Sequence, residues 1–79
     1  MWYELVIKSW GDFNDISRSI HSDVIPRVGE IIENYKAIDG ERNLEYQLTL
    51  KVEKVSHILF TNHPSSITVY AIVIESKLI

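Results

Sequence analysis

The chain has 79 residues, of which 46% are hydrophobic and 24% are charged, and its formal net charge is −3. This length suits one small domain, residues 1–79, and the composition argues against disorder. A core this small leaves a lone monomer only marginally stable. The sequence has no cysteine, which excludes disulfides, thiolate zinc sites and cysteine nucleophiles. The negative charge argues against broad attraction to phosphate backbones.

No apolar run approaches the length of a membrane-spanning helix, and no basic segment followed by an apolar stretch opens the chain. We therefore expect no membrane partner and no secretory signal. The lack of cysteine suits a reducing compartment, so the expected location is cytoplasmic.

Residues 1–9 alternate between apolar and polar positions, which predicts a strand that ends before Trp10-Gly11. The next segment, residues 14–22, holds one apolar pair at helical spacing, Ile16 and Ile20, and either Asp12 or Asn14 could cap it. One short helix, or a 3₁₀ turn, is expected there.

The middle of the chain predicts a β-hairpin. Residues 30–38 form a probable strand with imperfect alternation, which indicates a bulge or burial on both faces. Gly29 before it can adopt a positive φ. Asp39-Gly40 is a hairpin turn signal, which residues 41–43 could lengthen into a longer loop.

Residues 44–60 show the clearest alternation, and its phase slips at Lys54. A slip moves the apolar set to the other face, so we expect a bend or bulge at Glu53-Lys54 that divides the segment in two. A loop is expected at residues 61–66. Residues 67–74 are apolar on both faces, which is typical of a central strand.

Five short strands with a bent third segment predict an all-β (mainly β) antiparallel barrel that closes on itself. The turn Pro26-Arg27-Val28-Gly29-Glu30 and the segment Lys51-Val52-Glu53-Lys54-Val55 resemble those of SH3-like small bacterial β-barrel domains. The resemblance spans residues 24–74. It implies a small SH3-like antiparallel barrel of about five strands, with one short helix after the first strand, and it implies no function.

Catalytic and metal-binding patterns are missing from the sequence. His57 and His63 are not at a metal-ligand spacing, and His21 has no second ligand near it. No glycine-flanked serine forms a nucleophile elbow, and Ser65-Ser66 beside His63 is a poor nucleophile and base pair. We expect no catalytic residue, no metal and no cofactor, and therefore no enzyme.

The favoured function is a non-catalytic binding or adaptor module for protein–protein interaction or self-association, with a homo-oligomer possible. Its anchors would be the aromatic residues Trp2, Trp10 and Tyr35, because exposed aromatics commonly anchor interfaces. The alternative for both tryptophans is that they seal the barrel ends.

A less favoured alternative is weak binding of single-stranded nucleic acid, with Lys8, Lys51 and Lys54 contacting phosphates. Trp2 and Trp10 would stack on bases, and Tyr35 or Tyr70 could do the same. A third interpretation is a small phage or mobile-element protein that blocks a host protein; it depends only on small size, acidity and the lack of cysteine.

Overall fold

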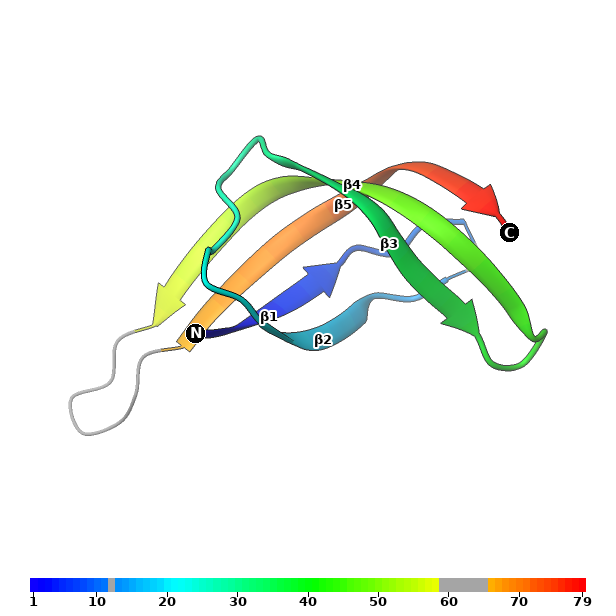
Figure 1. Cartoon of the computed structure of the whole chain (residues 1–79), viewed down its shortest axis with the longest axis horizontal. Helices are drawn as coiled ribbons and strands as arrows, with labels where there is room; N and C mark the ends of the chain where they lie inside the picture. Colours follow the sequence, from blue (N-terminus) through cyan, green and yellow to red (C-terminus); the bar gives the residue numbers. More distant parts are fainter. Residues whose placement is uncertain (12, 59–65) are drawn as a thin grey trace.

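The computed structural model describes residues 1–11, 13–58 and 66–79, and these form one curled sheet (Figure 1). Its strands follow one another in the order β2-β1-β5-β4-β3. The sheet curls into a half-barrel, which confirms the predicted all-β class. The strands are β1 (Trp2–Ile7), β2 (Ile16–His21), β3 (Ile31–Asp39), β4 (Leu44–Ile58) and β5 (Ser66–Leu78).

The pairing pattern corrects the expected antiparallel, closed barrel. β1 and β5 run parallel, while the other neighbouring strands are antiparallel. The sheet is also open, because β2 and β3 are its two edges and each has one paired neighbour. β5 is the middle strand of the five, as its two-sided apolar pattern predicted.

The helix expected at residues 14–22 is wrong, since β2 occupies Ile16–His21. Ile16 and Ile20 are four residues apart. This spacing places them on one face of a helix, and also on one face of a strand, where every second residue shares a face. In β2 these two residues lie opposite Ile7 and Tyr3 of β1, in antiparallel register. Pairing with β1 outweighs the weak helical pattern of a short, serine-rich segment.

The phase slip predicted near Lys54 is confirmed as a break in the β4–β5 register between Val52 and Lys54. A second shift occurs between Thr49 and Leu50. The segment is nevertheless one strand of 15 residues and does not divide in two. Bulges bend and twist a ladder without ending it, which gives this long hairpin its curvature.

The expected bulge in β3 is also present, between Ile32 and Tyr35, where Asn34 has a φ of 60°. The β3–β4 turn extends beyond Gly40. The Asp39 carboxylate accepts hydrogen bonds from the backbone N–H groups of Glu41 (3.0 Å) and Arg42 (3.3 Å). These bonds hold the longer loop that the sequence left open.

The segment between β2 and β3 crosses to β4 and closes one end of the core. Gly29 has the predicted positive φ, 91°, and its N–H donates to the Val52 carbonyl at 2.8 Å. The Val52 N–H in turn donates to the Glu30 carbonyl at 3.0 Å. These bonds extend the β3–β4 ladder up to the Glu53 bulge.

The hydrophobic core lies on the inner face of the curled sheet. Its buried side chains come from every strand except β2: Tyr3, Leu5, Ile7, Ala37, Leu48, Leu50, Val52, Val69 and Ala71. Ile16 and Ile20 of β2 pack against this cluster from the edge. Of the loop expected at residues 61–66, residues 61–65 lie outside the described part of the chain, and Ser66 begins β5. None of the described residues belongs to a helix that could cross a membrane.

Two leucines on the inner face give a test of this core. Leu48 is fully buried, whereas Leu78 is 56% exposed. Leu48→Ala leaves a cavity and lowers the free energy of unfolding by about 3 kcal/mol, while Leu78→Ala lowers it by less than about 1 kcal/mol. Urea denaturation followed by circular dichroism measures both, and equal losses would contradict this core assignment.

Candidate binding surfaces

The register of the strands separates inward from outward side chains. Residues paired across the sheet share a face, so the buried set marks the inner face and the intervening residues point outward. All five lysines of the chain point outward. Four are at outward strand positions, Lys36, Lys51, Lys54 and Lys77, and Lys8 lies just after β1. Outside the β3 bulge and the bulge at Glu53, the acidic residues at outward strand positions are Glu4, Glu45 and Glu75.

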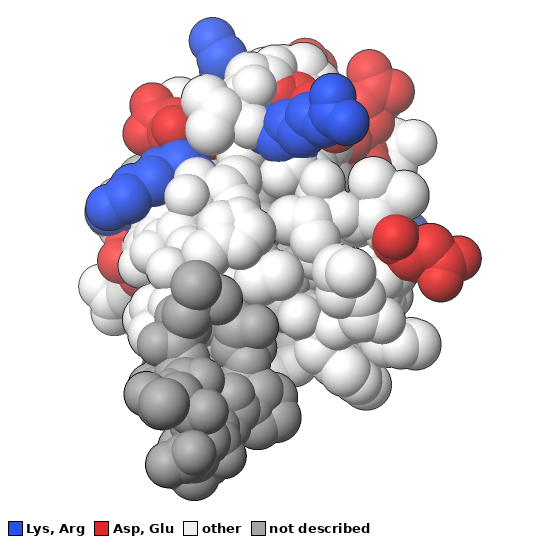
Figure 2. Space-filling model, turned by 90° about the vertical axis from the view of Figure 1, so that its left-hand side faces the viewer, with Lys and Arg blue, Asp and Glu red and all other residues white. Residues whose placement is uncertain are grey.

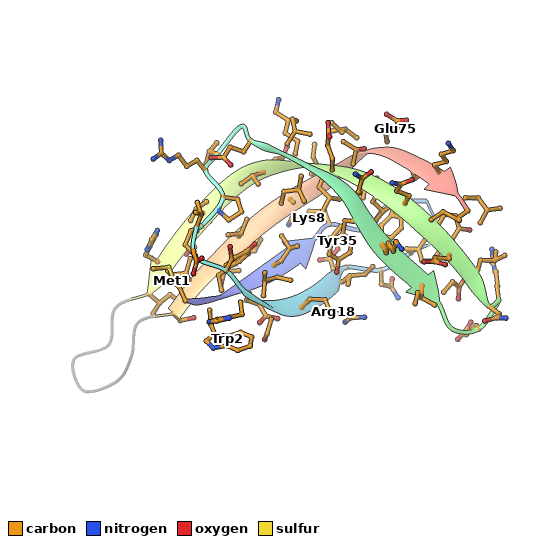
Figure 3. All side chains as sticks on the ribbon, viewed as in Figure 1. Met1, Trp2, Lys8, Arg18, Tyr35 and Glu75 are labelled. Atoms are coloured by element: carbon orange, nitrogen blue, oxygen red, sulfur yellow. The ribbon has the colours of Figure 1, made fainter. Side chains whose placement is uncertain are left out.

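Trp2 is on the outer face, at the start of β1, and 65% of it is exposed. Its ring lies 4.7 Å from the ring of its cross-strand partner His21, tilted by 36°. Figure 3 shows the indole outside the curve of the sheet, near the N-terminus. Of the three predicted aromatic anchors, Trp2 is the most accessible.

Trp10 lies at the opposite end of β1 and is half-buried against the core. Its ring stacks on Phe13 with a centroid separation of 4.5 Å. Phe13 in turn meets Tyr46 edge-on at 5.3 Å. This aromatic cluster covers one end of the half-barrel. Trp10 therefore seals an end of the sheet, which was the alternative to a role as an exposed anchor.

Tyr35 lies on the inner side of β3, opposite Leu48, and is half-buried. Figure 3 shows it within the curve of the sheet, away from Trp2. The structure therefore does not bring Trp2, Trp10 and Tyr35 onto one surface. Each belongs to a different region: the outer face, the barrel end and the open side.

The open side between β2 and β3 is a groove that we call the seam. It contains a hollow of about 170 Å³ lined by residues of both edge strands: Ile16, Arg18, Tyr35, Lys36, Ala37 and Ile38. A second hollow of about 370 Å³ continues from Ile16, Arg18 and Ile38 toward the two turns at one end. There Arg42 pairs with Asp39 at 3.8 Å, and Asp15 accepts a hydrogen bond from the Ser9 N–H at 2.7 Å.

On the outer face, two of the predicted lysines converge on Tyr70 of β5. The Lys8 and Lys54 ammonium groups lie 5.8 and 5.6 Å from the centre of its ring. Lys51 is on the same face and lies opposite Ile72, two residues further along β5. From the sequence, Lys51 is grouped with Lys54, and Tyr70 is one of several possible stacking residues. The meeting of Lys8 and Lys54 at Tyr70 was not predicted, because only β5 brings β1 and β4 together.

The end of the molecule near the N-terminus is largely uncharged. In Figure 2, uncharged residues fill most of the described surface at this end, and charged side chains lie toward its edges. Exposed apolar side chains of the chain include Val24 and Val28 in the β2–β3 connection, Ile58 at the end of β4, and Met1 and Trp2 at the N-terminus.

Two polar side chains of β1, Glu4 and Tyr3, have structural roles. The Glu4 carboxylate accepts hydrogen bonds from the hydroxyl groups of Ser17 and Ser19 across the β1–β2 pair. Burial raises the pKa of the Tyr3 phenol, which keeps it protonated in the core. Among the described residues, no three acidic or histidine side chains gather in a metal-binding group. His63 and Ser65 lie outside the described residues.

Comparison with known proteins gives no family assignment. No protein-family model, curated protein or solved structure matches the chain. The half-barrel is compatible with a barrel-like fold, and the SH3-like character remains a resemblance of sequence segments.

The different settings of the tryptophans predict different accessibility to a fluorescence quencher. In Trp10→Phe the remaining Trp2 is exposed, so acrylamide should quench its emission strongly. In Trp2→Phe the remaining Trp10 is stacked and half-buried, so its Stern–Volmer constant should be lower by about twofold or more. Equal constants would contradict the placement of these two side chains.

Proposed function

We propose that this chain is a non-catalytic binding module that holds an extended segment of a partner protein in the seam. The single observation that carries the proposal is that the two edge strands of the sheet, β2 and β3, face the same groove. Among the described residues, β2 and β3 each have a paired neighbour on one side only, and both line the hollow between them. Unpaired strand edges offer backbone N–H and C=O groups to an added strand.

The side chains of the seam support recognition of a peptide. Ile16 and Tyr35 are half-buried on the two sides of the hollow, and Ile38 is 74% exposed beside them. In strand addition, backbone hydrogen bonds give affinity, and pockets that accept alternate side chains give specificity. The hollows are at or below the low end of small-molecule site volumes, which suits single side chains of a peptide.

Charge in the smaller hollow favours an acidic residue at that point of the bound segment. Arg18 and Lys36 line the smaller hollow, and its lining contains no carboxylate. Arg18 occupies an inner-face position between Ile16 and Ile20, where a strand directed only at the core would carry an apolar residue. An apolar segment with one Asp or Glu opposite Arg18 matches this lining.

Features of the two edges oppose indiscriminate pairing with other copies. The inward charge of Arg18 interrupts the apolar face of β2, and the Asn34 bulge interrupts β3. Such devices limit edge-to-edge aggregation in natural sheets. Self-association, in which a second copy of the chain is the partner, is therefore the less favoured form of the proposal.

The substitution Ile38→Lys tests the seam. Ile38 is highly exposed and lies opposite Glu45, so a lysine there preserves folding. We expect peptides selected from a random-sequence library on the wild-type protein to bind Ile38→Lys at least about tenfold more weakly. Titration by isothermal calorimetry measures the affinity, and two-dimensional NMR locates the affected amides.

The matched control is Val24→Lys, which adds the same charge at an equally exposed apolar residue away from the seam. It should bind the selected peptides like the wild type. If light scattering instead shows a dimer that Ile38→Lys dissociates, the occupant is a second copy. A monomer whose selected peptides leave the β2 and β3 amides unperturbed refutes the proposal.

A further inference from the structure

We infer that the outer face carries a second, separate site, centred on Tyr70, for a short stretch of single-stranded nucleic acid. Two lysines converge on this residue, Lys8 just beyond the end of β1 and Lys54 of β4, and Lys51 of β4 lies opposite Ile72 on the same face. Two of their ammonium groups lie within 6 Å of the same ring. This arrangement is independent of the seam, which lies on the open side of the half-barrel.

The bulge at Glu53 creates the cluster. Lys51 and Lys54 are three residues apart, so in a regular strand they would point to opposite faces. The register shift between Val52 and Lys54 restores Lys54 to the outer face, where it lies opposite Tyr70. The same irregularity that bends the sheet therefore places both lysines on one surface.

The parallel pairing of β1 with β5 supplies the third lysine. The Lys8 N–H donates to the Ala71 carbonyl at 2.9 Å, which extends this pairing beyond the end of β1. Its ammonium group then reaches the Tyr70 ring from the β1 side, while Lys54 reaches it from the β4 side. The resulting track of positive charge runs across three strands.

Between these cations lies an apolar strip suited to bases. Val6, Tyr70 and Ile72 occupy outward positions on β1 and β5 and are half-buried. Single-stranded nucleic acid binds proteins through such a combination, in which phosphates contact lysines and bases contact aromatic and apolar side chains. Carboxylates alone would use the charges and leave the ring and the strip uncovered, whereas a nucleotide strand carries a phosphate and a base at each step and uses both.

The acidic residues on this face limit the site to a short segment. Glu4 is two residues from Val6 on the outer face, but its carboxylate is engaged by Ser17 and Ser19. Glu53 lies in the bulge beside Lys54. With a net charge of −3, the chain attracts phosphates only locally, so binding should be modest and strongly dependent on salt.

The test measures the affinity of fluorescein-labelled oligothymidine of about ten nucleotides by anisotropy over a series of salt concentrations. Three phosphate contacts predict a slope of log K against log salt of about −2, since each contact on a single strand contributes about −0.7. The double variant Lys8→Gln/Lys54→Gln should reduce the slope to about −0.7. The control Arg27→Gln/Lys77→Gln removes the same charge at two exposed positions away from Tyr70 and from the seam, and should keep the slope.

Substitution of the ring separates base contact from charge. Tyr70→Phe should keep the affinity, and Tyr70→Leu should weaken it on the order of tenfold. Circular dichroism checks that both variants are folded. Three results would each overturn the inference. They are an equal reduction of the salt slope in the two double variants, no binding at low salt, and equal competition by polyphosphate or polyglutamate at matched charge.

Discussion

The fold depends on the antiparallel pairing of β4 with β5, the two longest strands of the sheet. Two register shifts in this ladder bend it, and the bend allows one face to enclose the core. β3 attaches to the free side of β4, and β1 attaches to the free side of β5 and carries β2. Curvature brings β2 and β3 to a common groove without pairing them, which leaves the seam between them.

The sequence predicted what depends on local pattern. The alternation of residues 44–52, the phase slip at Lys54 and the two-sided apolar run at residues 67–74 gave the position, the bend and the central place of the strands. It failed for β2, because Ile16 and Ile20 share a face in both a helix and a strand. The parallel β1–β5 pair had no local signal, since the choice of strand partners is made by the whole sheet.

The candidate sites also divide into features with a local sequence pattern and features that depend on how the strands pair. The sequence left exposure and sealing open for both tryptophans; Trp2 is exposed, and Trp10 is half-buried in the aromatic cluster. The grouping of Lys8 with Lys54 around Tyr70 requires three strands and a bulge to come together, so no spacing in the sequence reveals it. The seam lies at the β2 and β3 edges and the Tyr70 cluster lies at the β1–β5–β4 junction, so the two candidate sites share no residue.

The central claim is that the half-barrel is open, with free edges at β2 and β3. Amide hydrogen exchange of the uncomplexed protein tests it most directly, because an amide directed away from a strand's only neighbour has no partner. The account predicts alternating fast and slow exchange along β2 and along residues 35–39 of β3, with β5 protected throughout residues 67–73. Uniform protection of both edge strands, at concentrations where the protein is monomeric, would show a closed barrel and contradict the account.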